Sequence, residues 1–553
     1  MHWRDLNLNN KIEFLPQNID SDSLSKIVEK YGDRIEAIYP LSPGQAWMLE
    51  KTKKVTDAFF LQNVFRVELA VRPEFADKWV KQVIRKRPSL RTAFAWRGMK
   101  TPYQVVLKER DAETKWIDRS DKGLEELSDE IEAFCAADRA RGFDLEQDTL
   151  VRAAIFEAKK NAYAIIISRP HLIDDGESDA LLAKDLFFDG LMKGKLRLAH
   201  FKKASYQEYA KWLEGRDREK DLLYWKELLK NGSMTALPWR RSSEKEMDLK
   251  TLVHSFSKEE TKKLQSLPGR YKATLNSILH AIWALLLAGH TGKKDLVFGT
   301  LASGRSTEVA GIDQLTGCFI NAFPVRVEVK EEEPFGELAR RIQAQILSSR
   351  EHAYLPPTEL ERELGKEEGF FDHLLNFHNF QGAAVADVIR KKLPGYTYLG
   401  VETYDNLSTG FCLYFDIIEG QLSLRFCYDA NQFSEEWIRK LERAFLRMIR
   451  QLLADKDQSL ACGRIQVLET ISDQLAAREV SEHTALICGE ESVSYRQLAA
   501  DAKRIARCLL AQGLRKGDRV LLTLENSINF VRAMYGVLLA GGVYVAADRK
   551  SVV

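Results

Sequence analysis

Short runs in which apolar and polar residues alternate are followed along the chain by longer amphipathic runs, and this succession limits the folds that the chain can adopt. Residues 422–428 alternate between apolar and polar side chains, which predicts a strand with one buried face. In residues 438–452 apolar side chains recur at steps of three and four, which predicts a helix that begins at Ser434 and buries one stripe. Strands and helices mixed in this way predict an α/β (α+β) fold in which helices cover sheets.

The composition excludes several classes of protein. The chain has 553 residues, enough for several domains of roughly 100–200 residues each. Its 82 Lys and Arg residues nearly balance 80 Asp and Glu residues, so the net charge of +2 gives no electrostatic case for binding nucleic acid. The sequence starts without the pattern of a secretion signal, and no apolar run reaches the roughly 18 residues that a membrane span needs. We therefore expect a cytoplasmic, multidomain protein with neither nucleic-acid nor membrane partners.

The cysteines and histidines give no pattern typical of a metal site. The seven cysteines are odd in number, scattered, and form no C-x-x-C pair. This argues against a disulfide framework and against a structural zinc site. His373 and His378 lie five residues apart, not the four that would place them on one helical face. We expect no metal.

The segment most informative about chemistry runs from Ser168 to Ser178. It leaves an apolar run and enters a predicted helix, and such a junction can present a side chain rigidly to a cleft. His171 can titrate near neutral pH, so it can accept or relay a proton. Asp175 follows four residues later, and Gly176 permits a tight turn before N–H groups that can favour an oxyanion. On this segment alone, a packed histidine beside a helix-capping aspartate is the simpler interpretation.

Further motifs occur in the order that is typical of condensation domains from nonribosomal peptide synthetases. Segments that resemble the seven motifs of this family lie at residues 39–45, 86–94, 168–178, 206–212, 297–326, 352–356 and 371–379. The most specific match is the fifth, which contains VFGT, SGR, GCFIN and PVR in that order. The third resembles the active-site motif H-H-x-x-x-D-G, with one departure: Pro170 replaces the first histidine, whereas His171 matches the second. The resemblance covers roughly residues 35–455.

The C-terminal part resembles a second family. Residues 493–498 and 538–545 are similar to the first two motifs of adenylation domains. The chain stops at Val553, before the phosphate loop and the late catalytic lysine of that family, so we expect a truncated start of an adenylation domain without adenylating activity. A carrier-domain serine motif of the G-G-x-S type is also missing, so the resemblance implies that carriers come from elsewhere.

The resemblance to condensation domains implies a V-shaped pseudo-dimer of two chloramphenicol-acetyltransferase-like lobes with a tunnel between them. The expected division is a linker at 1–35, an N-lobe at 36–185, a C-lobe at 186–455, a linker at 456–482 and the adenylation-domain start at 483–553. His171 would lie midway along the tunnel, which admits two phosphopantetheine arms from opposite sides.

The reaction that the resemblance implies is amide formation. The α-amine of an aminoacyl thioester on a downstream carrier attacks the acyl or peptidyl thioester on an upstream carrier. The expected partners are therefore the two peptidyl carrier domains and the adjoining adenylation domain. The substrates arrive on the phosphopantetheine of the carriers, and the condensation domain itself is expected to bind no cofactor.

The residues that the resemblance assigns to catalysis are His171, Asp175 and Gly176. His171 is expected mainly to orient the amine and relay its proton, and Asp175 to act as a structural anion. The expected partner of Asp175 is an arginine such as Arg91. Other candidates for this salt bridge are Arg305 and Arg326, and candidates for lining the tunnel are Ser42, Asn321 and Asn379.

Alternatives to amide formation stay open. Because Pro170 replaces the first motif histidine, a degenerate, non-catalytic domain that recruits carrier or tailoring proteins is the alternative, although proline can stiffen the loop without abolishing chemistry. Ester formation and epimerisation are related activities. An AMP-forming ligase would need nucleotide motifs that this sequence lacks.

Overall fold

The computed structural model describes residues 12–69, 73–183, 205–238, 240–243, 247–366, 368–378, 396–406, 409–418, 420–455, 458–465, 475 and 481–547. The contacts divide the chain into two compact units, Met1–Phe445 with Ile449–Arg464, and Leu446–Met448 with Ile465–Val553. The division near residue 465 lies within the segment 456–482, where a linker is expected.

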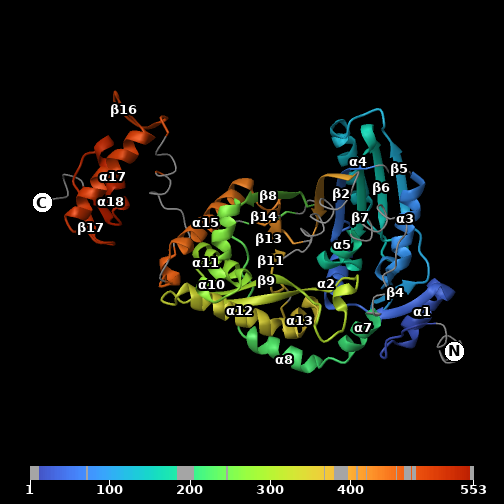
Figure 1. The fold of residues 1–553 in the computed structure, drawn as a ribbon. Coiled ribbons are helices and arrows are strands. Elements are labelled where there is room, and N and C mark those ends of the chain that lie inside the picture. The colour runs from blue at the N-terminus through green and yellow to red at the C-terminus, as the bar shows by residue number, and fades with distance from the viewer. Residues whose placement is uncertain are drawn as a thin grey trace. The chain divides into compact units, whose positions relative to one another are not determined.

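Within the described residues, the strands of the first unit form three sheets (Figure 1). The smallest has the order β1 (Ile35–Pro40), β4 (Tyr103–Leu107), β3 (Thr92–Ala95). The next has the order β12 (Tyr396–Asp405), β2 (Phe60–Leu69), β7 (Ala162–Pro170), β6 (Arg152–Ala158), β5 (Glu113–Asp118). The largest has the order β10 (Ile320–Glu328), β9 (Asp295–Ser303), β11 (His373–His378), β13 (Phe411–Ile418), β14 (Gln421–Asp429), β8 (Leu249–Ser255).

The strand β12 reaches its sheet from far along the chain. It pairs antiparallel with β2 from Tyr396 opposite Leu69 to Asp405 opposite Leu61. β2 in turn pairs antiparallel with β7, the strand that leads to His171. The sheet of the expected N-lobe thus receives a strand from the segment assigned to the C-lobe, while the expected boundary at residue 185 lies outside the described residues.

The helices of the first unit cover these sheets. The described ones are α1 (Ser21–Tyr31), α2 (Pro43–Thr52), α3 (Pro73–Lys86), α4 (Ser128–Arg141), α5 (Gly176–Ala183), α7 (Tyr206–Glu214), α8 (Arg218–Leu228), α9 (Lys258–Gln265), α10 (Leu267–Tyr271), α11 (Leu275–Thr291), α12 (Phe335–His352), α13 (Pro357–Glu363) and α15 (Glu435–Ala454). In the described part of the chain, no single helix is long and apolar enough to cross a membrane. The segment formed by α9 and α10 passes that test together with α11, but the two parts are bent by 91° relative to each other. Most of α11 is buried in the core.

Two local sequence predictions are confirmed. The alternating run at 422–428 lies in β14, with its apolar side chains buried and its strand paired antiparallel with β13. The predicted helix start is also observed, because the Oγ of Ser434 accepts a hydrogen bond from the N–H of Trp437 at the start of α15. In α15, Ile438, Phe445 and Leu452 are fully buried, as the stripe of apolar residues predicts.

The second unit contains two pairs of strands and two helices among its described residues. β15 (Thr484–Cys488) and β16 (Glu491–Ser494) pair antiparallel, and β17 (Arg519–Leu522) and β18 (Val543–Ala546) pair parallel. The helices are α17 (Tyr495–Ala511) and α18 (Ile528–Leu539). They pack together over a small core that includes Val493, Leu498 and Ala502.

Candidate active site

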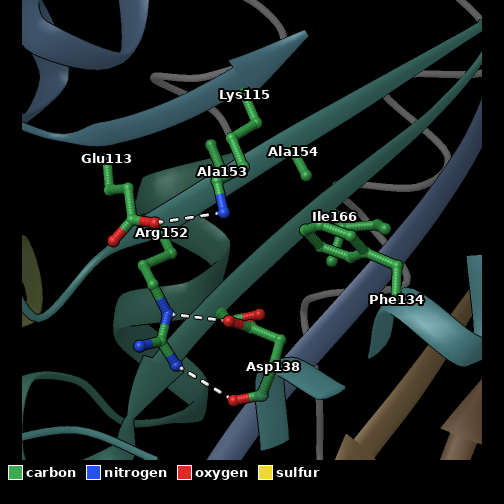
Figure 2. A pocket seen from close by; sticks show the side chains of 9 residues that line it. Glu113, Lys115, Phe134, Asp138, Arg152, Ala153, Ala154 and Ile166 are labelled. Atoms are coloured by element: carbon green, nitrogen blue, oxygen red, sulfur yellow. Dashed lines mark hydrogen bonds and ion pairs between the residues drawn. The ribbon is translucent and has the colours of Figure 1, made fainter. Parts of the chain in front are cut away.

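A pocket at the five-stranded sheet is lined by paired charges (Figure 2). The Nε of Arg152 on β6 lies 2.9 Å from an Oδ of Asp138 on α4. The Nζ of Lys115 on β5 lies 3.5 Å from an Oε of Glu113. Each of these four groups has an opposite charge beside it, so they present no unpaired charge to a ligand.

The segment that contains His171 is held rigidly where β7 ends. After Pro170 the chain makes one 3-10 turn, and the His171 N–H donates to the carbonyl of Phe59 at 2.8 Å. The next two side chains are fully buried in the core beneath the turn. From α2, the side-chain amide of Gln45 donates to the carbonyl of Leu172 at 2.8 Å. The turn is therefore fixed by one hydrogen bond to the residue before β2, by another from α2, and by the packing of its own side chains in the core.

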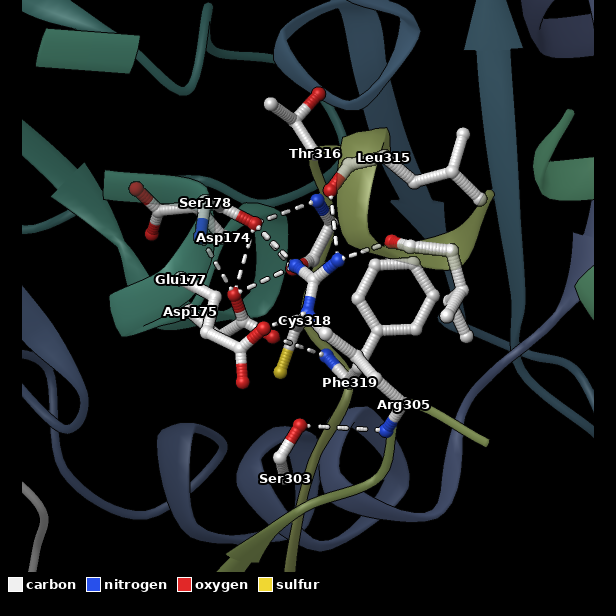
Figure 3. A network of polar contacts seen from close by, with 12 residues as sticks. Asp174, Asp175, Glu177, Ser178, Ser303, Arg305, Leu315, Thr316, Cys318 and Phe319 are labelled. Carbon is white, nitrogen blue, oxygen red and sulfur yellow. Dashed lines mark hydrogen bonds and ion pairs between the residues drawn. The ribbon is translucent and has the colours of Figure 1, made fainter. Parts of the chain in front are cut away.

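Asp175 is the centre of a buried polar network (Figure 3). One carboxylate oxygen accepts from the N–H and the Oγ of Ser178, both at 2.8 Å, and from Arg305 at 2.9 Å. The other accepts from the N–H of Phe319 at 3.1 Å. The Oγ of Ser178 in turn accepts from the N–H of Gly317 at 3.0 Å. Asp175 thus joins the active-site turn to the segment after β9. It also accepts from the N–H of Ser178, one of the N–H groups after Gly176 that were expected to favour an oxyanion.

Of the three candidate arginines, Arg305 is the one that contacts the motif carboxylate. Arg91, named first from the resemblance, instead pairs with Glu36, with 2.6 Å between a guanidinium nitrogen and a carboxylate oxygen. Arg326 pairs with Asp295 at 2.8 Å. Arg305 occupies this place because the SGR segment ends β9 beside the active-site turn, whereas the other two lie near acidic residues of their own surroundings.

The other candidate residues have varied surroundings. Gly176 begins α5. The Oγ of Ser42 caps α2 and donates to the carbonyl of Cys318 at 2.9 Å, so this hydroxyl joins α2 to the segment before β10. Asn321 on β10 is buried, and its side-chain oxygen has no hydrogen-bond partner among the described residues. Asn379 lies outside the described residues.

His171 faces a carboxylate that the sequence analysis did not identify. Its Nε2 lies 3.1 Å from an Oδ of Asp405, the last residue of β12. The second Oδ accepts from the hydroxyl of Tyr414 on β13 at 3.0 Å. The side chains of His171 and Asp405 are 8% and 18% exposed. No motif marks Asp405, because its proximity to His171 depends on the pairing of strands more than 200 residues apart.

The two charges stabilise each other. Burial alone would lower the pKa of His171, but the charge and hydrogen bond of Asp405 and the charge of Asp174 outweigh it, so this pKa is raised above its ordinary value. Burial raises the pKa of Asp405, but His171 and then Tyr414 lower it by more, so the net direction is downward. These opposite shifts favour an imidazolium–carboxylate pair.

A second buried ion pair lies behind the turn. Arg169 on β7 bonds to Asp174 through its Nε and donates to the side-chain oxygen of Asn63 on β2 at 2.9 Å. The amide of Asn63 donates to the Oγ of Thr403 on β12 at 3.0 Å. Burial nevertheless raises the pKa of Asp174. This polar layer joins β7, β2 and β12 beside His171.

The described residues contain no group of three or more His, Cys, Asp or Glu side chains placed to hold a metal ion. All seven cysteines carry free thiols. The ionisable groups at this turn include an imidazole with its carboxylate, next to a buried ion pair.

Comparison with known families identifies two segments. Residues 35–474 match the model of the condensation domain, and residues 473–551 match that of the AMP-binding enzymes. The resemblance stated from the sequence motifs is confirmed for both.

The curated relatives are large synthetases. The chain is 27% identical over 562 residues to bacitracin synthase 1 of Bacillus licheniformis, covering 96% of this chain and 11% of the relative. It is 29% identical over 548 residues to surfactin synthase subunit 3 of Bacillus subtilis (strain 168), covering 94% of this chain and 42% of the relative. The chain thus spans less than half the length of each of these relatives.

Solved structures share the fold. A four-domain nonribosomal peptide synthetase bound to AMP and glycine matches with a TM-score of 0.66 and 17% identity, covering 93% of this chain and 42% of that one. The first condensation domain of the calcium-dependent antibiotic synthetase, in complex with a substrate analogue, matches with a TM-score of 0.63 and 17% identity, covering 78% of this chain and all of that one. The predicted fold class is confirmed.

Proposed function

The chain belongs to the condensation-domain family, and from this premise we propose that it forms amide bonds between two carrier-bound substrates. The α-amine of an aminoacyl thioester on a downstream carrier attacks the carbonyl of an acyl or peptidyl thioester on an upstream carrier. A C–N bond forms, the C–S bond breaks, and the thiol of the upstream phosphopantetheine leaves with the proton that the amine gives up. Both substrates are presented by carrier domains, so the chain needs no cofactor of its own.

The rigid placement of His171 is the observation that carries this proposal. General-base assistance contributes roughly 3–5 kcal/mol to lowering a barrier, whereas orientation of two reactants contributes about 7–11 kcal/mol. Positioning therefore outweighs proton abstraction. In this proposal His171 orients the amine and takes its proton from the tetrahedral intermediate, while Asp175, with Arg305 and Ser178, keeps the turn in place. Gly176 begins the helix that follows.

The tunnel and its lining stay predictions. Ser42 and Asn321 are proposed to border the passage for the two phosphopantetheine arms. The adjoining adenylation segment is proposed to act only with further chain, because the match at residues 473–551 covers a fragment of that family. The cytoplasmic location is likewise a prediction.

The test is an assay of the full chain with two separately produced carriers, one loaded with an acyl donor and the other with an aminoacyl acceptor. The expected product is an acyl-aminoacyl thioester on the downstream carrier, detected by mass spectrometry. Omission of either loaded carrier should abolish it. Product that forms equally well from the two loaded carriers when the chain is left out would contradict the proposal.

A non-catalytic domain that recruits carriers is the second candidate. One observation favours it: Pro170 stands in place of the first motif histidine. In the same assay this candidate predicts that loaded carriers bind, measured by titration calorimetry, and that no product exceeds the uncatalysed background across several substrate pairs.

A further inference from the structure

We infer that Asp405 is a positioning residue, which reaches the active-site turn from strand β12 and holds the imidazole of His171 through Nε2. The inference rests on the proposed function, in which His171 acts on the acceptor amine. It adds a residue that lies outside every motif-like segment of the sequence.

The backbone fixes the distance between the two side chains. Asp405 lies opposite Leu61 on β2, and Leu61 lies opposite Arg169 on β7, so the three residues share a face of the sheet. Beyond these pairs, Phe59 donates its N–H to the carbonyl of Asn406 at 2.7 Å, and its own carbonyl accepts from the His171 N–H at 2.8 Å. Three segments are therefore hydrogen-bonded together at the point where the imidazole meets the carboxylate.

The carboxylate itself is oriented from a second sheet. One Oδ of Asp405 faces His171, and the other accepts from the hydroxyl of Tyr414 on β13. Tyr414 is fully buried, and the guanidinium of Arg425 lies 4.4 Å from the centre of its ring. Both carboxylate oxygens thus have a partner, and rotation of Asp405 away from the imidazole would break a buried hydrogen bond.

The charged groups around His171 leave Asp405 as its dominant partner. Asp174 lies on the same turn, but Arg169 from β7 pairs with it and offsets its charge. Asp405 has no arginine bound to its carboxylate among the described residues, and its charge is the largest influence that favours the protonated ring.

Both ring nitrogens face oxygen. Nε2 faces the carboxylate of Asp405, and Nδ1 lies 3.5 Å from the carbonyl of Asp174. A protonated ring points an N–H at each oxygen, whereas a neutral ring points one lone pair at an oxygen. The arrangement therefore fits an imidazolium in the resting protein. His171 must lose this proton before it can accept one from the amine, so Asp405 sets the pH range in which His171 acts.

The test follows the titration of His171 by NMR in the full chain with isotope-labelled histidines. The resonance of His171 among the ten histidines is assigned by its disappearance in His171→Ala. Asp405→Asn preserves the shape of the side chain and removes its charge, so the titration midpoint of His171 should fall below that of the parent. Asp405→Glu, which keeps the charge, should move it back toward the parent value.

Two further variants separate positioning from a general loss of structure. Tyr414→Phe removes one hydrogen bond that orients Asp405 and keeps the carboxylate, so the His171 midpoint should fall below that of the parent by less than in Asp405→Asn. If Asp405→Asn does not fold, this variant carries the test: a lowered midpoint supports the role of Asp405, and a midpoint equal to that of the parent overturns it. Asp57→Asn is the matched control, because Asp57 accepts a hydrogen bond from Tyr404, next to Asp405, and the midpoint should not move.

The outcomes distinguish the role of Asp405 from the proposed amide-forming function. A His171 midpoint that is the same in the parent and in folded Asp405→Asn overturns the role of Asp405, whatever the carrier assay gives. If the midpoint of folded Asp405→Asn falls and the parent forms no amide product, the inference about His171 stands and the proposed function fails.

Discussion

At the scale of single residues, two of the ion pairs at the active-site turn differ in role. The Asp175–Arg305 pair has both side chains at most 4% exposed, and the carboxylate accepts four hydrogen bonds in all. The pair of His171 with Asp405 is more open, and its carboxylate raises the pKa of the imidazole above the ordinary value. The first arrangement suits a fixed support, and the second suits a group that must exchange a proton.

Removal of Arg305 should destabilise the fold strongly. Arg305→Ala leaves the carboxylate of Asp175 buried without its countercharge, which typically costs about 3–5 kcal/mol of unfolding free energy. The control is Arg326→Ala, whose pair with Asp295 is 25% and 43% exposed and should contribute no more than about 1 kcal/mol. Urea denaturation of both variants checks this, and equal losses would contradict the supporting role of Arg305.

The His171–Asp405 pair predicts a pH window of stability. The raised pKa of His171 gives stabilisation that is complete below its ordinary value of 6.5 and is lost as the pH rises through the folded value. The lowered pKa of Asp405 gives stabilisation that is present above 3.8 and is lost as the pH falls through the folded value. The difference in unfolding free energy between the parent and Asp405→Asn should therefore be largest between these two values. A difference that is constant from pH 3 to pH 9 would show that the pair is not ionic.

At the scale of elements, the site depends on close packing between α2 and β10. The ideal Cβ position at Gly44 in α2 lies 2.0 Å from the carbonyl oxygen of Ile320, closer than any real contact. The glycine thus lets the helix approach the strand, and the cap at Ser42 completes the contact by its hydrogen bond to the carbonyl of Cys318. Only backbone atoms and small groups fit in this space.

A methyl group at Gly44 should therefore force the two elements apart. Gly44→Ala is expected to lower the free energy of unfolding by about 1–3 kcal/mol, as overpacking usually does. Gly269→Ala in α10 is the matched control, because no atom lies within 4 Å of its Cβ position. Thermal unfolding measures both, and a Gly44→Ala variant as stable as the control would contradict the close approach.

Helices and strands that depend on neighbouring residues can be predicted from this sequence, whereas contacts that depend on the pairing of distant strands cannot. The strand at 422–428 and the helix after Ser434 follow from the spacing of apolar residues and from a cap. The place of Asp405 follows from the register between β12 and β2, and β2 lies far away in sequence. For the same reason the motifs predicted a partner arginine for Asp175 but not which of three arginines it is.

At the scale of the whole condensation unit, segments far apart in sequence meet at one turn. Gln45 fixes it from α2, Arg305 from the segment after β9, and Asp405 from β12. The second unit is separate by its contacts, and its described part has only a small core and several exposed apolar side chains, Ile487 among them at 75%. The proposed chemistry therefore belongs to the first unit.

The most direct test of this account is the single-turnover rate of amide formation with both carriers loaded in advance, compared between the parent and His171→Ala. We predict a rate about 10²–10⁴ times lower in the variant, the usual contribution of one general acid–base group. His254→Ala, which alters a partly exposed histidine paired with Glu442, should keep the parent rate. Equal rates in the parent and His171→Ala, both above the uncatalysed reaction, would contradict the role of His171.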